Sequence, residues 1–160
     1  MFRRLYDKKV SATGLAIFRI TYTLVLLAEI LQFYYFRHLI FDRIPFIEQS
    51  EINFSIPIII WGISVLFVLI GLFTRTATII NYLLSLILIG SITTYEYHMF
   101  YAYMGINFLL IFLPISRNIS TDRLLLKYKY SHTKFEYNPS REVSVLAYFI
   151  PILVGVAFVY

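Results

Sequence analysis

Long apolar stretches joined by short polar connections are the feature that most constrains the fold of this chain. About 20 apolar residues span a bilayer core as a helix. Stretches that reach or approach this length lie at about residues 10–36, 56–73, 77–95, 99–114 and 143–160. The composition agrees, because 59% of the residues are hydrophobic and only 14% are charged. The sequence therefore predicts an all-α integral membrane protein with about five transmembrane helices.

The first apolar stretch could be mistaken for a signal peptide, because it follows the basic segment MFRRLYDKK. It is too long for a signal peptide, carries Arg19, and lacks an obvious cleavage site of small residues. We therefore expect a first transmembrane helix that is retained. The last stretch stops at Tyr160 in the middle of an apolar run. We expect residues 1–160 to be one transmembrane domain that forms the N-terminal part of a longer chain.

The positive charges alternate between the connections. The tail before residue 10, the turn 71–77 and the segment 115–142 carry four, one and six of the 14 Lys and Arg residues. The intervening connections carry two and none. The positive-inside rule then places the N-terminus and the segment 115–142 in the cytoplasm.

The segment that follows residue 115 contains STDRLLLKYKY, which begins with Ser120 and Thr121 as candidate helix caps. Leu124, Leu125 and Tyr128 would share one face of such a helix, with cations beside them. The pattern predicts a basic interfacial helix within 115–142 that rests on anionic lipids at the cytoplasmic face of the bilayer. Cations confined to such short segments favour this partner over a nucleic acid.

Arg19 and Glu29 are ionisable groups within the first apolar stretch. Their positions are ten residues apart, about 15 Å along a helix, so they cannot pair directly. We expect Arg19 near the middle of the membrane and Glu29 near the outer interface. The alternating topology predicts a central polar layer and an outer polar layer. The central layer would hold Ser64, Ser85 and Asn107 with Arg19, and the outer layer would hold His38, Glu96 and His98 with Glu29.

Two interpretations remain open for these groups. Arg19 either packs helices by bonding to backbone carbonyls, or lines a cavity with Asn107 that binds substrate. Glu29 and His98 either reach the aqueous interface, or act as catalytic residues in proton transfer. No metal site is expected, because the chain has no cysteine and its two candidate histidines and few acids form no recognisable ligand pattern.

Several motifs, in order, resemble the horizontally transferred transmembrane (HTTM) family, which includes the vitamin K-dependent gamma-carboxylases. TGLAIFR at 13–19, with Glu29 after it, is similar to the first helix of that family. GLFTRTATIINYLL and YHMFYAYMGINFLLIFLP resemble its second-to-third turn and its fourth helix. LPISRNISTDRLL resembles the following loop, in which Ser120 and Asp122 match a structural Ser-x-Asp pattern.

The resemblance implies a bacterial inner-membrane protein with carboxylase-like chemistry, in which reduced vitamin K or another quinone is oxidised. The family's initiating lysine follows the fifth helix and would lie beyond Tyr160. The chain departs from the carboxylase pattern at Tyr97, Ser116 and Arg117, where carboxylases carry Asn, Asn and His. These departures weigh against vitamin K-dependent carboxylation itself.

Three functions are consistent with these patterns. The first is an HTTM-type membrane enzyme that acts on a lipophilic quinone-like or lipid substrate. The second is a non-catalytic membrane scaffold, or a subunit that contacts a membrane partner protein. The third is a small transporter subunit that uses Arg19 as an anion site.

Overall fold

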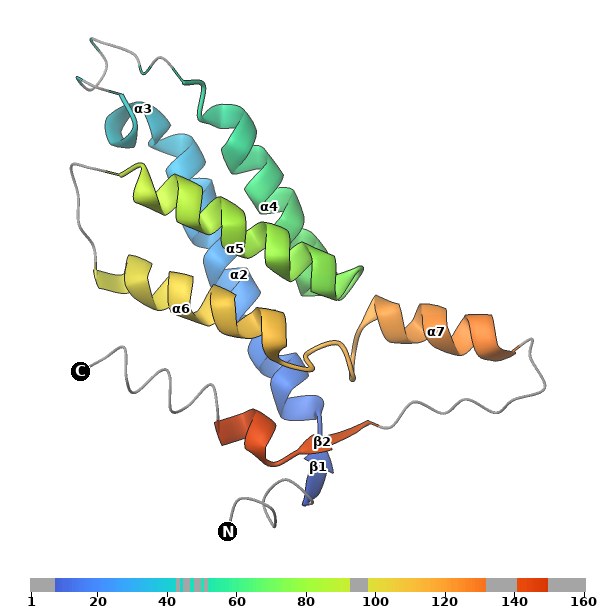
Figure 1. The fold of residues 1–160 in the computed structure, drawn as a ribbon. Coiled ribbons are helices and arrows are strands. Elements are labelled where there is room, and N and C mark those ends of the chain that lie inside the picture. Colours follow the sequence, from blue (N-terminus) through green and yellow to red (C-terminus); the bar gives the residue numbers. More distant parts are fainter. Residues whose placement is uncertain are drawn as a thin grey trace.

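The structure is a computed structural model, which describes residues 8–42, 44, 47, 50, 52–92, 98–131 and 141–149. The described residues are mostly helical, which confirms the predicted helical fold class. Four long helices form a bundle, with a one-turn helix and a separate amphipathic helix attached to it (Figure 1). The bundle helices are α2 (Thr13–Tyr35), α4 (Ser55–Ile70), α5 (Thr74–Gly90) and α6 (His98–Phe112), and the others are α3 (Arg37–Ile40) and α7 (Thr121–Ser131).

Helices α2, α4, α5 and α6 pack in sequence order, each against the next. A ring contact between Tyr22 of α2 and Tyr103 of α6 brings the first and last of them together. Each long helix runs between two ends of the bundle. We call one the Gly71 end, where the α4–α5 turn lies, and the other the His38 end, where α3 lies (Figure 1).

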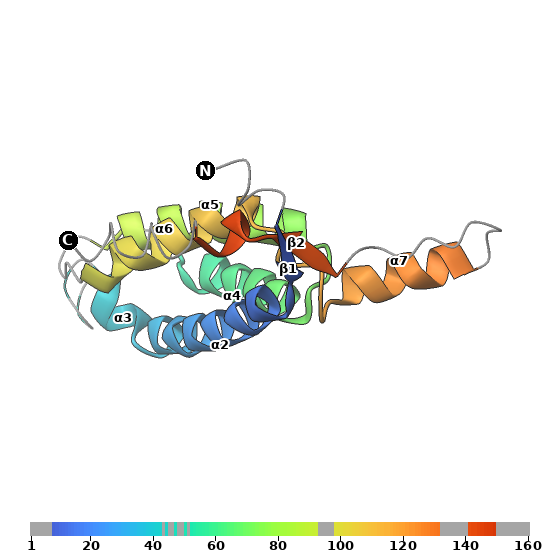
Figure 2. The same cartoon turned by 90° about the horizontal axis from the view of Figure 1, so that it is seen from below.

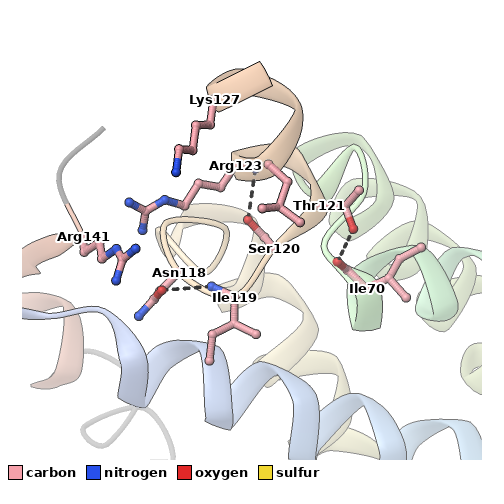
Figure 3. A pocket seen from close by; sticks show the side chains of 9 residues that line it. Ile70, Asn118, Ile119, Ser120, Thr121, Arg123, Lys127 and Arg141 are labelled. Atoms are coloured by element: carbon pink, nitrogen blue, oxygen red, sulfur yellow. Dashed lines mark hydrogen bonds between the residues drawn. The ribbon is translucent and has the colours of Figure 1, made fainter. Parts of the chain in front are cut away.

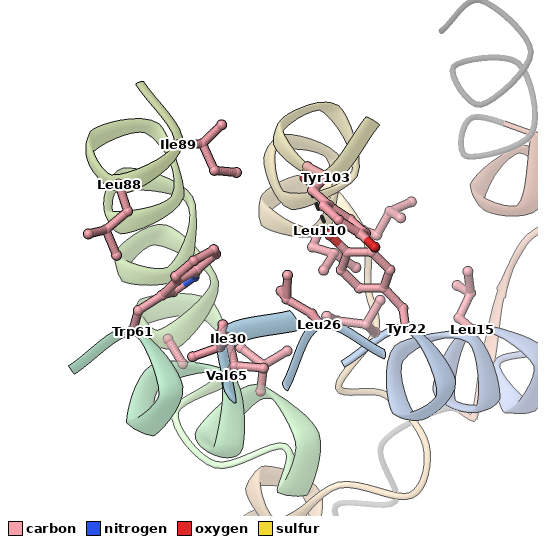
Figure 4. Packing of buried hydrophobic residues seen from close by; sticks show 14 of the residues in the cluster. Leu15, Tyr22, Leu26, Ile30, Trp61, Val65, Leu88, Ile89, Tyr103 and Leu110 are labelled. Carbon is pink, nitrogen blue, oxygen red and sulfur yellow. Dashed lines mark hydrogen bonds between the residues drawn. The ribbon is translucent and has the colours of Figure 1, made fainter. Parts of the chain in front are cut away.

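The bundle buries polar side chains and exposes apolar ones. Aromatic and aliphatic side chains from all four helices fill the core, including Trp61 and Leu26 (Figure 4). Fully buried polar side chains lie among them: Arg19, Thr23, Thr78, Asn81, Ser85 and Asn107. The outer surface carries many large apolar side chains, for example Ile56, Ile59, Ile63, Leu66 and Ile70 of α4. Most soluble domains show the opposite preference for their charged and amide side chains.

Helix α2 has 23 residues and is, within the described residues, the one helix long and apolar enough to cross a membrane. The core helix of a soluble protein or a signal sequence can have the same length and composition. The other apolar bundle helices are shorter, with 16, 17 and 15 residues in α4, α5 and α6. All four begin and end within a few residues of the apolar stretches from which they were predicted.

A two-stranded antiparallel sheet at the Gly71 end was not predicted. Strand β1 (Lys9–Ser11) pairs with β2 (Glu142–Ser144), with Val10 opposite Val143. Val143 is buried in the core, so the sheet anchors the C-terminal part of the described chain to the start of α2. The expected fifth helix therefore does not begin at residue 143. Residues 146–149 form a helical turn, and 150–160 lie outside the described residues.

Helix α7 confirms the helix predicted within 115–142. Ser120 caps it, because its Oγ accepts a hydrogen bond from the backbone N–H of Arg123 at 3.3 Å. Leu124, Leu125 and Tyr128 are exposed, and so are the other residues from 124 to 129. The helix projects away from the Gly71 end of the bundle (Figures 1 and 2). It does not lie flat across that end.

Candidate functional site

Arg19 is completely buried and is held by backbone carbonyls. Its Nη1 donates to the carbonyl of Ile115 at 3.0 Å, and its Nη2 donates to the carbonyl of Ile119. Both acceptors belong to the segment between α6 and α7. The Nε atom has no hydrogen-bond partner in the described part of the chain. The guanidinium therefore fastens this segment to α2.

The position of the guanidinium differs from the prediction, because it lies at the Gly71 end and not in the middle of the bundle. A helical side chain leans toward the N-terminus of its helix, and Arg19 lies only about 9 Å along α2. A long side chain at this position therefore reaches the end of the bundle. Ser64 and Ser85, which were expected beside Arg19, bond instead to carbonyls of their own helices, each at 2.8 Å.

Gly71 makes room for Arg19 at the turn between α4 and α5. Its φ is 71°, in the left-handed region that favours glycine. A Cβ at this position would lie 2.7 Å from Nη1 of Arg19 and 2.6 Å from Cβ of Ser120. The absence of a side chain therefore permits both the turn and the close approach of the guanidinium.

Asp122 joins α7 to α5 at the same place. Its carboxylate accepts hydrogen bonds from the backbone N–H groups of Phe73 and Thr74 at 2.7 and 2.8 Å, and from the Thr74 hydroxyl at 2.7 Å. The first N–H groups of a helix lack partners within the helix, and the N-terminus favours negative charge. The backbone N–H of Asp122 also donates to the carbonyl of Gly71 at 2.9 Å. We call Arg19, Gly71, Ser120 and Asp122 the Gly71 clamp.

Asn107 belongs to a different cluster, which joins the four bundle helices. Its Oδ1 accepts from the hydroxyl of Tyr22 at 2.9 Å and from Nδ2 of Asn81 at 2.8 Å. Oδ1 of Asn81 in turn accepts from Nε1 of Trp61 at 2.7 Å. One residue from each of α2, α4, α5 and α6 takes part. Asn107 is thus separate from Arg19, and its Nδ2 has no partner among the described residues.

Glu29 lies nearer the His38 end and is bound to α6. The hydroxyl of Tyr103 donates to its Oε1 at 3.0 Å. His98 is the first residue of α6, but its side chain and Glu96 lie outside the described part of the structure. The expected pairing of Glu29 with His98 therefore stays a prediction.

An apolar pocket of about 320 Å³ lies at the His38 end. Phe33, one helical turn after Glu29, lines it together with Phe100, three residues before Tyr103. The Phe33 ring lies 5.6 Å from that of Phe100 and 6.0 Å from that of Trp61, measured between ring centres. The remaining lining residues are Phe36, Leu39, Ile40 and Ile92. The aromatic lining residues Phe33 and Phe100 thus lie about one helical turn, along α2 and α6, from the hydrogen-bonded pair Glu29 and Tyr103.

His38 lies in α3, beyond the end of α2. Its Nδ1 is 3.1 Å from Oδ2 of Asp42, and this pair lines a separate polar pocket of about 340 Å³. His38 was expected at the level of Glu29, and it belongs to this outer pocket instead. Within the described ranges, no three His, Cys, Asp or Glu residues gather as metal ligands would.

Sequence reasoning singled out Arg19, Glu29, Asn107, Ser120 and Asp122, but it missed most of their partners. The missed residues are Tyr22, Trp61, Gly71, Asn81 and Tyr103. Asn81 could have been found as an amide within an apolar run, whereas an aromatic hydroxyl in such a run gives no comparable signal.

No protein-family model, curated protein or solved structure matches this chain.

Proposed function

We propose that this chain is an integral membrane protein of a bacterial inner membrane, with its N-terminus and α7 on the cytoplasmic side. The arrangement of the bundle supports this placement, because its outer surface is apolar and its amide and guanidinium groups are inside. A surface of this kind is stable against lipid tails and costly against water. The alternating Lys and Arg content of the connections supports the orientation.

Within this bundle, we propose an HTTM-type enzyme that acts on a lipophilic quinone-like or lipid substrate. The observation that carries the proposal is the apolar pocket lined by Phe33, Phe36 and Phe100, one helical turn from Glu29. Aromatic side chains stack on flat rings, so these residues fit reduced vitamin K or another quinone as the bound group. Such a group would supply the redox chemistry. Glu29, with His98 at the start of α6, is the candidate proton acceptor.

Arg19 and Asn107 have positioning roles in this proposal. Two donor groups of Arg19 bond to carbonyls, and Asn107 bonds to Tyr22 and Asn81. Neither residue lines the apolar pocket. These contacts favour the packing interpretation of both residues over direct substrate binding. The engaged Nη atoms of Arg19 also argue against the transporter alternative, in which Arg19 would bind an anion.

The single tryptophan of the chain allows a direct test of the pocket. Trp61 packs against Phe33, whose ring lines the pocket, and quinones quench indole fluorescence at short range. The purified protein in nanodiscs would be titrated with a short-chain menaquinone analogue, and saturable quenching is expected. Phe36→Ala removes a lining ring that is 46% exposed, and it should raise the apparent Kd about tenfold.

Phe108→Ala is the matched control, because Phe108 is similarly exposed on α6 but does not line the pocket. It should leave the apparent Kd unchanged. Quenching that rises without saturation, and equally in all three proteins, would show simple partitioning into lipid. That outcome would contradict the enzyme proposal.

A non-catalytic membrane scaffold, or a subunit of a membrane complex, is the second candidate. The observation that favours it is the internal use of the polar groups: the residues of the Gly71 clamp and Asn107 all bind other parts of the bundle. A scaffold needs rigid helices and no substrate. Quenching that does not saturate, measured on a purified protein that remains folded, would favour this candidate over the enzyme.

A further inference from the structure

We propose that the pocket between α7 and the Gly71 end binds a phosphate group, carried either by an anionic phospholipid or by a free phosphate ester. The pocket has a volume of about 420 Å³. Arg123 and Lys127 of α7 line it, and Arg141, just before β2, lines it from the other direction. The three cationic side chains lie on one side of the pocket and Ile70 on the other (Figure 3).

The fold brings these cations together from distant parts of the sequence. Arg123 and Lys127 lie on the same face of α7, because they are four residues apart. Arg141 is held nearby because its carbonyl accepts a hydrogen bond from the backbone N–H of Ala12 at 2.8 Å, next to the β1–β2 pair. Arg123 is itself fixed, since its Nη1 donates to the carbonyl of Arg117 at 2.9 Å. The fold itself therefore positions the three cations next to the pocket.

The charged side chains that line the pocket are all cationic among the described residues, since the lining there includes Arg123, Lys127 and Arg141 and no Asp or Glu. Like charges held close together repel one another, and a bound anion relieves that repulsion. Arg and Lys are the side chains that proteins use to bind phosphate, Arg through paired N–H groups and Lys as a point charge. A phosphate mono- or diester is the ligand class that fits.

Part of the pocket lining is apolar and exposed. Ile70, Ile119 and Leu124 belong to this part and are 49%, 54% and 67% exposed. A phospholipid offers both a phosphate and an adjoining acyl chain, and this combination matches a lining that is partly cationic and partly apolar. The lipid source rests on the membrane placement proposed above, in which the Gly71 end lies at the level of the cytoplasmic headgroups.

Native mass spectrometry of the whole protein, released from detergent, can test the site with three probes. Dioctanoyl phosphatidylglycerol has both parts of the ligand, dioctanoylglycerol has the chains without phosphate, and glycerol 3-phosphate has phosphate without the chains. We expect one phosphatidylglycerol per protein and little dioctanoylglycerol. Lys127→Gln and Arg141→Gln should each weaken phosphatidylglycerol binding about fivefold. Lys129→Gln is the control, because Lys129 is a cation of α7 outside the pocket lining, and binding should not change.

The outcomes separate the sources and can overturn the site. Glycerol 3-phosphate that binds as tightly as phosphatidylglycerol, with the same sensitivity to Lys127→Gln, would identify a free phosphate ester as the ligand. Equal weakening by Lys127→Gln and Lys129→Gln would show only diffuse attraction between charges, and the site would be rejected. Equal binding of dioctanoylglycerol would also reject it. The glycerol 3-phosphate measurement needs neither a membrane nor the quinone pocket, so its result does not depend on the function proposed above.

Discussion

At the scale of single residues, Arg19 shows how a buried cation is accommodated without a carboxylate in direct contact. An isolated charge within a membrane or a protein core costs several kcal/mol unless polar groups replace its water. Here the carbonyls of Ile115 and Ile119 do so. These carbonyls follow the end of α6 and are bound by the guanidinium, so the same contacts satisfy both partners. Arg19 therefore defines the path of the chain from α6 to α7.

Gly71→Ala should destabilise the protein by forcing apart the contacts of this arginine. A left-handed backbone costs a non-glycine residue about 1–2 kcal/mol. The new Cβ would in addition lie 2.7 Å from Nη1 of Arg19 and 2.6 Å from Cβ of Ser120. We expect the melting temperature of the detergent-solubilised protein to fall by several degrees.

Gly90→Ala is the control for that substitution. Gly90 ends α5, and nothing lies within 4 Å of a Cβ built there. Alanine should therefore leave the melting temperature unchanged or raise it slightly, since alanine is favoured over glycine in helices by about 1 kcal/mol. Equal losses in the two variants would show that the close approach at Gly71 has no special importance.

The sequence identified the buried polar residues better than it identified their contacts. Arg19 and Asn107 stand out because they interrupt apolar stretches. Their depths were inferred from residue position alone, which ignores the direction in which a helical side chain points. That direction moves the Arg19 guanidinium to the Gly71 end, while Asn107 stays among Tyr22 and Asn81. The tertiary partners of a polar side chain depend on helix rotation, which one amphipathic pattern does not fix.

At the scale of helices and strands, Asp122 connects two helices that are far apart in the sequence. It lies in the first turn of α7, and its carboxylate caps the start of α5 with three hydrogen bonds. The cap of α5 comes from another element because its own preceding residue, Phe73, offers no polar side chain. Asp122 also explains in physical terms why a Ser-x-Asp pattern suits this loop: Ser120 caps one helix and Asp122 caps the other.

Asp122→Ala should lower the free energy of unfolding by about 1–2 kcal/mol, the usual cost of losing a helix cap. Asp122→Asn should cost less, since an amide oxygen can still accept one hydrogen bond from the start of α5, although the favourable charge at the helix terminus is lost. The melting temperatures of both variants and the wild type would measure these effects. If the Asn variant were as unstable as the Ala variant, the negative charge would be the main contribution of this residue, and the hydrogen-bond geometry would matter less.

The helices were predictable and the strands were not, for a physical reason. Apolar stretches determine where α2, α4, α5 and α6 lie, because burial or lipid contact requires such stretches. The pairing of Lys9–Ser11 with Glu142–Ser144 joins residues more than 130 positions apart in three-residue segments. Segments this short show no clear alternation of apolar and polar residues, so the continuous apolar pattern extended the predicted first helix back to residue 10.

At the scale of the whole molecule, the lengths of the helices bear on the proposed membrane placement, because α2 is the one described helix long and apolar enough to cross a bilayer. Helix α2 is about 34 Å long and α4 about 24 Å long, from their 23 and 16 residues, compared with about 30 Å for a hydrocarbon core. Bundles that are slightly short thin the bilayer locally at modest cost. Strand β1, helix α7 and Arg141, which carry basic residues, all lie at the Gly71 end. A single orientation of the bundle therefore places all of them on the same side of the membrane.

This orientation can be tested because the chain contains no cysteine. Ile52→Cys introduces a thiol before α4 at the His38 end, and Lys129→Cys introduces one on the exposed face of α7; both native side chains are exposed. In intact bacterial spheroplasts, a membrane-impermeant maleimide should label the first variant at once. It should label the second only after the membrane is permeabilised, because α7 would lie in the cytoplasm. The reverse pattern would invert the orientation and move the phosphate pocket to the periplasmic side. Labelling of both thiols in intact cells would contradict a bundle that separates the two ends by a membrane, and the exposed apolar side chains of α4 and α5 would then need a protein partner to cover them.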